Sequence, residues 1–414
     1  MTHMTCAFAC APRRAALPIL GTPAIALAFA FAVALAACSN TAITSTPTAS
    51  GPIASQPPAS SPITAPARDD LAAATLDRPR GRWVAASWGE LPDWDADRLA
   101  EFWPAFLRSC ERPTPAWLDT CARARRQGPA PAGDAMAVRS WLQRQLRPYR
   151  VESIERDPAG LATGYFEPLV DASRVARKGF RVPLYGPPPD LASRRPYWTR
   201  HQLETLPAAQ RSVRGHEIAW LRDPLDALML QVQGSGRLAF AAEPGSSART
   251  VRVAYAAHND QPYVSVGRWL IDQGELRPSE ASWPAIRAWA RQHPARVDEM
   301  IRANPRVVFF REEPLPDPGI GPKGAQGVPL TPGRSIAVDP LSVPYGTPVW
   351  LDTTEPLSSR PLRRLAVAQD TGSAIVGAVR ADYFWGWGDD AEAEAGRMKQ
   401  ALRMWVLWPA PPDR

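Results

Sequence analysis

The spacing of apolar residues is helical in several separate stretches of the chain. Between residues 97 and 110, apolar side chains recur every three or four positions, which predicts an amphipathic helix with Asp95 or Asp97 as its N-cap. Another helix is predicted from an Asp134 cap to the helix-breaking Pro148. Further helices are predicted to begin near Pro115, Thr199, Ser265, Ser282 and Pro294.

Short apolar runs bounded by turn residues predict β-strands elsewhere. The predicted strands are residues 217–221, 229–232, 238–241, 250–255, 306–311, 335–338, 348–351, 365–368 and 404–407. Residues 151–154 and 161–166 are predicted to pair as a hairpin around a turn at 157–160. Residues 374–379 are predicted to run back as an apolar segment after a turn at 370–372. We therefore expect a mainly β chain with flanking helices.

The N-terminal region has the pattern of an export signal. In residues 1–37, two arginines precede an almost wholly apolar stretch, which predicts a signal peptide. Leu35-Ala-Ala-Cys38 resembles the lipobox of bacterial lipoproteins, which implies cleavage before Cys38 and lipidation of that residue; an uncleaved anchor helix is the alternative. Ser39 follows, which in such lipoproteins implies the outer membrane, on its periplasmic face. Residues 38–75, rich in Ser, Thr, Pro and Ala, are predicted to be a flexible tether.

Composition narrows the choice of partners. The chain has 414 residues, 45% of them hydrophobic, which is enough for two domains. Its net charge of +7 falls to +5 without the two signal arginines, and no dense Lys/Arg block occurs. This mild excess suits an anionic polymer or a membrane surface, and we predict no nucleic-acid partner. An oxidising compartment favours a disulfide between Cys110 and Cys121, although the sequence alone does not prove the pairing.

Two aspartates near the C-terminus are the strongest candidates for chemistry. Asp370 and Asp382 each follow a short apolar run. Tyr383, Phe384 and Trp385 follow Asp382, so aromatic rings can exclude water and raise the pKa of its carboxyl group. A carboxyl group with such a pKa can act as a general acid near neutral pH. The alternative is that both aspartates only cap turns.

The other polar motifs support carbohydrate binding more than metal or nucleophile chemistry. Neutral amide and hydroxyl groups near glycines can hydrogen-bond sugars, and these candidates are Gln231, Gln233, Ser235 and Asn259. The histidines of the mature chain show no metal-ligand spacing and no pairing with cysteine, so neither a metal site nor a Ser-His-Asp triad is predicted. Asp370-Thr-Gly-Ser373 is similar to an aspartic protease signature, but that chemistry needs two copies or a small homodimer; this chain has one copy and is too long for the dimeric type.

Five separated motifs resemble the membrane-bound lytic murein transglycosylase A family, bacterial outer-membrane lipoproteins that cleave peptidoglycan. They are Thr163-Gly-Tyr-Phe-Glu-Pro168, Leu230-Gln-Val-Gln-Gly-Ser-Gly-Arg237, Tyr255-Ala-Ala-His-Asn259, Asn304-Pro305 before Val308-Phe-Phe310, and Gln369-Asp-Thr-Gly372 through Arg380-Ala-Asp-Tyr-Phe-Trp-Gly386. The resemblance implies a double-psi β-barrel main domain with an inserted β-rich domain and a glycan groove between them. The implied boundaries are 76–168 and 313–411 for the barrel, with a three-aspartate region at 328–408, and 169–312 for the insert.

The resemblance also assigns roles to individual residues. Asp382 matches the catalytic acid and Asp370 its supporting aspartate, with no metal and no organic cofactor. Asp382 would protonate the glycosidic oxygen and then accept the proton of the substrate's own 6-hydroxyl, giving 1,6-anhydro-N-acetylmuramic acid. The implied substrate-binding residues are Thr163, Gly164, Tyr165, Phe166, Gln231, Gln233, Gly234, Ser235, Tyr255, Asn259, Asp339 and Trp385.

The implied partners are peptidoglycan glycan strands, the outer membrane through lipidated Cys38, and other wall-remodelling proteins. Two alternatives stay open at this point. One is a muramidase-type hydrolase that uses Asp382 with Asp370 or Glu167, since hydrolysis normally needs two carboxyl groups. The other is a noncatalytic peptidoglycan-binding lipoprotein, which would release no product.

Overall fold

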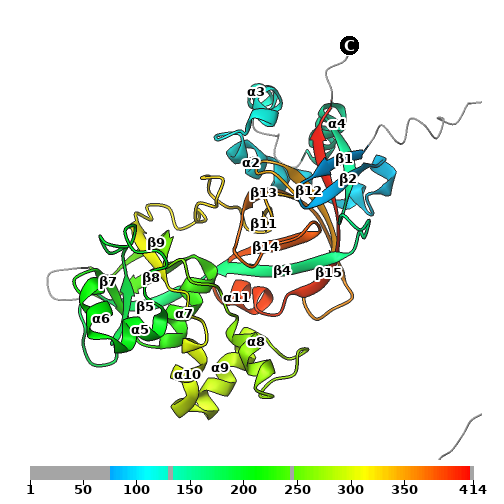
Figure 1. The fold of residues 1–414 in the computed structure, drawn as a ribbon. Coiled ribbons are helices and arrows are strands. Elements are labelled where there is room, and N and C mark those ends of the chain that lie inside the picture. The colour runs from blue at the N-terminus through cyan, green and yellow to red at the C-terminus, as the bar shows by residue number, and fades with distance from the viewer. Residues whose placement is uncertain (1–74, 129–133, 243–246, 411–414) are drawn as a thin grey trace, which may run out of the picture. The chain divides into compact units, whose positions relative to one another are not determined.

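The computed structural model describes residues 75–128, 134–242 and 247–410. The predicted signal peptide, Cys38 and all of the predicted tether except its last residue lie outside these ranges. The described part of the chain is mainly β with flanking helices, which confirms the predicted fold class (Figure 1).

The larger sheet has nine strands in the order β1-β2-β3-β15-β12-β13-β11-β14-β4. Their bounds are β1 Thr75–Arg78, β2 Gly81–Ala85, β3 Leu146–Glu152, β4 Gly160–Glu167, β11 Ser335–Val338, β12 Pro348–Thr354, β13 Pro361–Asp370, β14 Arg380–Trp387 and β15 Lys399–Pro409. Strand β15 also pairs with β4, so the strands from β15 round to β4 close into a barrel. The β11–β13 and β14–β4 pairs are parallel.

Both faces of the central barrel strands are buried, so successive apolar side chains go to different cores. Along β13, Leu365 and Val367 face a helical layer, whereas Ala366 and Ala368 face the barrel interior. The same alternation places Trp350 of β12 in the helical layer. This double burial explains why these strands appear in the sequence as continuous apolar runs.

Helices cover the outer face of the barrel. They are α2 Leu99–Ser109, α3 Leu118–Gln127 and α4 Ala135–Gln145, with the 3-10 turns Trp88–Glu90, Trp94–Ala96 and Pro115–Trp117. Their aromatic side chains pack against Trp350 and Trp405 of the barrel. A disulfide joins Cys110, directly after α2, to Cys121 in α3, with Cα atoms 5.2 Å apart.

The smaller sheet has the order β10-β9-β8-β5-β7-β6. Its strands are β5 Leu169–Ser173, β6 Val182–Tyr185, β7 Glu217–Leu221, β8 Ser235–Phe240, β9 Arg249–His258 and β10 Val308–Glu313. The helices in this part are α5 Arg200–Thr205, α6 Pro207–Val213, α7 Pro224–Gln233, α8 Val266–Asp272, α9 Trp283–Gln292 and α10 Val297–Arg302, followed in the barrel part by α11 Asp389–Ala395. The chain passes directly from β4 to β5 through Pro168 (Figure 1).

Four local predictions were wrong. Residues 229–232 lie in α7 and not in a strand, because Asp223 caps a helix with Pro224 in its first turn. The predicted hairpin does not form, since β3 and β4 each pair with β15. Residues 374–379 form an irregular loop and not an apolar strand-like segment. Neither predicted aspartate caps α2; Asp97 instead binds the buried Arg334.

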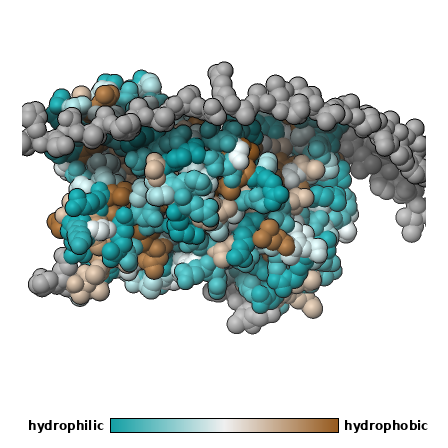
Figure 2. All heavy atoms as spheres, turned by 90° about the horizontal axis from the view of Figure 1, so that it is seen from below, coloured by the Kyte–Doolittle hydropathy of each residue, from teal (hydrophilic) through white to brown (hydrophobic). Residues whose placement is uncertain are grey.

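None of the helices within the described ranges combines the length and the apolar character needed to cross a bilayer. The face seen in Figure 2 is largely hydrophilic where it is described, with hydrophobic residues in small separate groups.

Candidate active site

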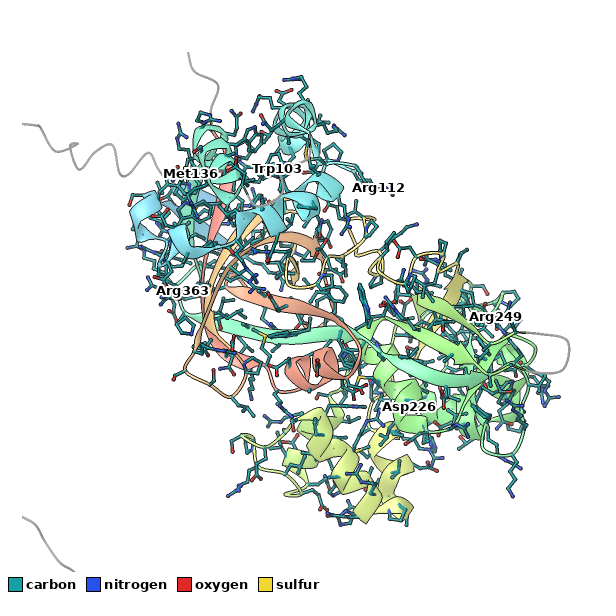
Figure 3. The ribbon with its side chains drawn as sticks, turned by 180° about the vertical axis from the view of Figure 1, so that it is seen from behind. Trp103, Arg112, Met136, Asp226, Arg249 and Arg363 are labelled. Atoms are coloured by element: carbon teal, nitrogen blue, oxygen red, sulfur yellow. A yellow bond between two sulfur atoms is a disulfide. The ribbon has the colours of Figure 1, made fainter. Side chains whose placement is uncertain are left out.

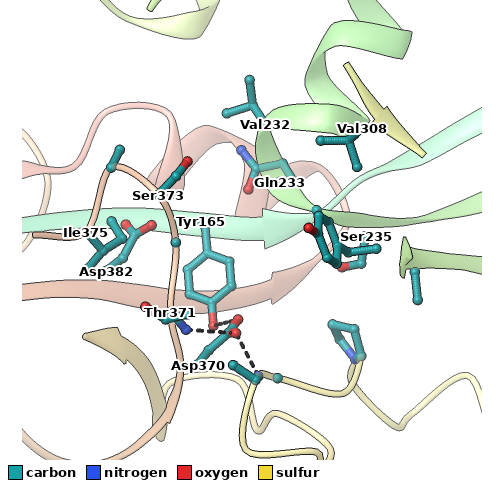
Figure 4. A pocket seen from close by; sticks show the side chains of 18 of the residues that line it. Tyr165, Val232, Gln233, Ser235, Val308, Asp370, Thr371, Ser373, Ile375 and Asp382 are labelled. Carbon is teal, nitrogen blue, oxygen red and sulfur yellow. Dashed lines mark hydrogen bonds between the residues drawn. The ribbon is translucent and has the colours of Figure 1, made fainter. Parts of the chain in front are cut away.

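A cavity of about 880 Å³ lies between barrel strands and the end of α7 (Figure 4). Ten of the predicted site residues line it: Thr163, Gly164, Tyr165, Gln231, Gln233, Gly234, Ser235, Tyr255, Asp370 and Asp382. The cavity therefore brings together segments that are more than 200 positions apart in the sequence.

Strand register brings the two aspartates to one place in the barrel. Ala337 of β11 pairs with Asp370 on one side and with Asp382 on the other. Asp382 in turn pairs with Thr163 of β4. Side chains at paired positions point to the same face of a sheet, and two strand spacings put the aspartate backbones roughly 10 Å apart. The small side chain of Ala337 leaves space between the two carboxyl groups.

Asp382 is partly buried, and one of its oxygens is held by a relay of hydrogen bonds. The hydroxyl of Thr163 donates to Oδ1 of Asp382 at 2.5 Å, and Nη2 of Arg380 donates to the same hydroxyl oxygen at 2.8 Å. Because the arginine can only donate, the threonine proton must point at Asp382. No described residue donates to Oδ2 of Asp382, so that oxygen is free to carry and transfer a proton.

Burial raises the pKa of Asp382, while the Thr163 hydrogen bond and the positive charge of Arg380 oppose the rise. The net result is a pKa above the ordinary value. A carboxyl group of this kind can donate a proton closer to neutral pH than an exposed aspartate can.

Asp370 is held more tightly than Asp382. Its Oδ1 accepts hydrogen bonds from the backbone N–H groups of Ala325 and Thr371, both at 2.9 Å, and its Oδ2 accepts from the hydroxyl of Tyr165 at 3.1 Å (Figure 4). Burial raises the pKa of Asp370 to about 6, against the effect of these three donors, and the charge of Asp382 adds to the rise. Burial and the two aspartates keep the pKa of Tyr165 well above its ordinary value, so the phenol remains a donor.

The end of α7 supplies neutral polar groups to the facing wall. The helix ends at Gly234, whose φ of 77° is the left-handed conformation that favours glycine, and Ser235 begins β8. Gln233 accepts a hydrogen bond from the backbone N–H of Phe166 at 3.0 Å, and Gln231 accepts one from Arg200 at 2.6 Å. These contacts engage the side-chain oxygens and fix both amides at the cavity.

Four predicted substrate-binding residues do not line this cavity. Phe166 is buried beside Met229 of α7, and Trp385 packs edge-on against Tyr383. Asn259 is fully buried and hydrogen-bonds the backbone of Trp198, Pro305 and Val307. Asp339 accepts hydrogen bonds from the N–H groups of Leu341 and Gly377. Each of these side chains shapes the protein around the cavity.

Glu167 is also a structural residue. It is fully buried, and its carboxylate accepts hydrogen bonds from Nε of Arg237 at 2.8 Å and Nε of Arg252 at 2.5 Å. Arg237 also lies over the ring of Trp387, at 4.2 Å from its centroid. Glu167 is therefore not available as the second carboxyl group of a hydrolase.

Sequence reasoning missed the loop 322–330 and several cations at the cavity. Missed lining residues include Arg112, His258, Arg306, Arg311, Lys323, Ala325 and Arg380. A signal was present, because glycine at 324 permits a close approach: a Cβ there would lie 2.5 Å from the carbonyl oxygen of Gln369. Arg380 stands two residues before Asp382 and had no role assigned to it.

The comparisons with known proteins agree on one family. Residues 161–311 match the "MltA specific insert domain" model and residues 334–408 match the "3D domain" model. Membrane-bound lytic murein transglycosylase A of Escherichia coli K12 is 31% identical over 291 residues, covering 66% of this chain and 75% of the relative.

Solved structures give the same result. The lytic transglycosylase LtgG of Burkholderia pseudomallei has a TM-score of 0.56 at 43% identity, covering 81% of this chain and 97% of that one. Escherichia coli MltA with bound chitohexaose has a TM-score of 0.61 at 26% identity, covering 76% of this chain and 90% of that one. On the strength of the sequence relatives, this chain belongs to the membrane-bound lytic murein transglycosylase A family.

Proposed function

We propose that this protein is a lytic transglycosylase that cleaves the β-1,4 bond between N-acetylmuramic acid and N-acetylglucosamine in peptidoglycan, with Asp382 as its single general acid and base. The observation that carries the proposal is a partly buried Asp382 with a raised pKa, whose Oδ2 accepts no hydrogen bond from any described residue. The second aspartate in the cavity accepts three hydrogen bonds and is poorly suited to attack a sugar.

The reaction uses the same carboxyl group twice. Protonated Asp382 donates to the glycosidic oxygen as the bond breaks, and the resulting carboxylate accepts the proton of the 6-hydroxyl of the same muramic acid ring. That hydroxyl attacks C1 and closes the 1,6-anhydro bridge. The attack is intramolecular, so it avoids the entropic cost of bringing in a separate nucleophile. No enzyme nucleophile and no bound water are consumed.

Asp370 is a positioning residue in this proposal. Its three donors fix the loop at Ala325, the turn at Thr371 and the ring of Tyr165 around the cavity. The amide groups of Gln231 and Gln233 and the hydroxyl of Ser235 bind the sugar hydroxyl and acetamide groups. A solved relative holds chitohexaose, an oligomer of N-acetylglucosamine, which agrees with neutral hydrogen-bonding groups in such a site.

The domain and membrane assignments belong to the same proposal. Residues 76–168 and 313–411 form the barrel domain and residues 169–312 the insert, with the glycan strand bound between them. Lipidated Cys38 anchors the protein to the periplasmic face of the outer membrane, and residues up to 75 tether it there. The relatives are named as membrane-bound enzymes, which supports anchoring to a membrane.

The test is mass spectrometry of the soluble products after purified peptidoglycan is digested with the mature protein lacking Cys38. Muropeptides ending in 1,6-anhydro-N-acetylmuramic acid are expected from the wild type and not from Asp382→Asn. Products one water heavier, with reducing ends, would replace the proposal with hydrolysis. Binding without any product would favour a noncatalytic wall-binding protein.

A further inference from the structure

Two cations on the wall of the cavity have side chains without a hydrogen-bond or ion-pair partner among the described residues. They are Arg112 and Lys323, and both are exposed. The other cations there are engaged: Arg380 donates to Thr163, Arg311 pairs with Glu313, and Arg306 donates to the carbonyl oxygen of Gln261. Exposed cations without partners at a binding cavity favour an anionic group on the ligand.

One ordered loop, residues 322–330, carries Lys323 and lies beside Arg112. Backbone hydrogen bonds close it, from Leu330 N–H to Pro322 O at 2.8 Å and from Gly324 N–H to Val328 O at 3.0 Å. Lys323 lies in one arm of the loop. Arg112 lies against its tip, because a Cβ at Gly327 would come within 2.9 Å of the Arg112 guanidinium.

The loop is fixed to the helical layer and to the active site. The buried amide of Gln326 accepts from the hydroxyl of Ser109 at 2.7 Å and donates to the carbonyl oxygen of Arg112 at 3.1 Å. Its neighbour Ala325 donates to Asp370. Figure 3 shows Arg112 at the edge of the helical layer that covers the barrel. The loop that carries Lys323 is therefore anchored both to the segment that carries Arg112 and to the proposed catalytic groups.

We propose that Arg112 and Lys323 form a subsite for a carboxylate of the N-acetylmuramyl unit. The glycan backbone is neutral, whereas the lactyl group of N-acetylmuramic acid carries a carboxylate when it is free, or a peptide with its own carboxylates when it is substituted. Both sources share the chemistry that a guanidinium and an ammonium group bind. This inference deepens the proposed function and rests on it for the identity of the substrate.

The test measures binding in the Asp382→Asn background, so that it does not depend on turnover. The variant Arg112→Gln/Lys323→Gln is compared with Lys178→Gln, which removes an exposed lysine that does not line the cavity. Thermal melting confirms that each variant is folded. Three probes are used: solubilised strands with peptide stems, strands treated with an amidase that exposes the lactyl carboxylate, and neutral chitohexaose.

We expect the double variant to bind at least one charged probe about tenfold more weakly, as two exposed charge-assisted contacts would give. Its affinity for chitohexaose should be unchanged, and Lys178→Gln should behave like the parent with all three probes. A loss confined to peptide-bearing strands assigns the subsite to a stem carboxylate, whereas a loss for amidase-treated strands assigns it to the lactyl carboxylate. Added salt should weaken the parent more than the double variant.

An equal loss for chitohexaose and the charged probes, or no loss for any probe, would overturn the subsite. The proposed function is judged separately by the products of the active protein. Anhydro products with unchanged binding in the double variant would leave the transglycosylase in place and remove the subsite. Charge-dependent binding without any product would support the subsite and contradict the proposed transglycosylase activity.

Discussion

Replacing Asp370 by asparagine should stabilise the protein at neutral pH while impairing its activity. Burial raises the pKa of this aspartate from 3.8 to about 6, so the folded state binds the proton more strongly than the unfolded state. The favourable contribution of Asp370 to stability is complete below pH 3.8 and is lost as the pH rises through about 6. Above that pH, the buried charge lowers the free energy of unfolding by about 3 kcal/mol, which corresponds to the rise in pKa from 3.8 to about 6.

Asparagine fits the same hydrogen-bonding positions. Its Oδ1 can accept from the N–H groups of Ala325 and Thr371, and its amide nitrogen can donate to the hydroxyl oxygen of Tyr165. The substitution therefore removes the charge without orphaning a backbone donor. About 3 kcal/mol is the ceiling, because the tyrosine must turn its proton elsewhere.

Urea unfolding of the wild type and Asp370→Asn at several pH values measures this effect. The difference in free energy of unfolding should be small near pH 4 and should grow to about 2–3 kcal/mol in favour of the variant by pH 8. Asp77→Asn, at an exposed strand position, is the matched control and should show no such growth. A variant that is less stable at pH 8, or a difference independent of pH, would refute the account of Asp370.

Three further predictions test other contacts. Thr163→Val removes the hydrogen bond that lowers the pKa of Asp382, so this pKa should rise. The alkaline limb of the pH profile of kcat/KM on solubilised strands should then move up by about one pH unit. An unmoved limb would argue against Asp382 as the acid. Glu167→Gln leaves two buried guanidinium groups without their charge partner and should lower the free energy of unfolding in urea by about 3–5 kcal/mol. A loss below about 1 kcal/mol would contradict that structural role. Gln326→Ala removes the hydrogen bonds that hold the loop 322–330 to Ser109 and Arg112, and kcat should fall more than KM rises. An unchanged kcat in a folded variant would show that this anchoring is not needed for catalysis.

Local signals predicted much of the fold. The caps at Ser265 and Ser282 each accept a hydrogen bond from the third helical residue, as their positions in the sequence indicate. Residues 335–338 were predicted to form a strand because a short apolar run between turn residues is typical of a buried strand. In both cases the information lies within a few residues of the element.

The errors share a physical cause, which is that short apolar segments and strand partners are not decided locally. Residues 229–232 suit a buried strand as well as a buried helix turn, and the cap at Asp223 decided the outcome. The pairing of β15 with β4 joins Lys399 to Thr163, and no local pattern marks a partner so distant.

Sequence reasoning found side chains that line the cavity but missed a backbone group that holds one of them. Both aspartates were found from their motifs, yet Ala325 contributes only its N–H group, which has no sequence signature. Asn259 shows the converse problem, because an amide suited to a sugar also suits four backbone groups in a core. Residue type alone does not distinguish these two uses.

The unequal supply of hydrogen-bond donors to the two aspartates supports the proposed one-acid mechanism. Both lie beside Ala337 in the same barrel and both are partly buried, so burial raises the pKa of each. Asp370 has donors on both of its oxygens, whereas Asp382 has one donor on Oδ1 and no described donor on Oδ2. Asp370 also binds a proton, since its pKa is raised to about 6, but protein donors engage both of its oxygens. Oδ2 of Asp382 has no described donor, so it can exchange a proton with a substrate without breaking a hydrogen bond to the protein. We therefore propose that proton transfer to the substrate falls to Asp382, and a substrate that supplies its own nucleophile needs no second acid.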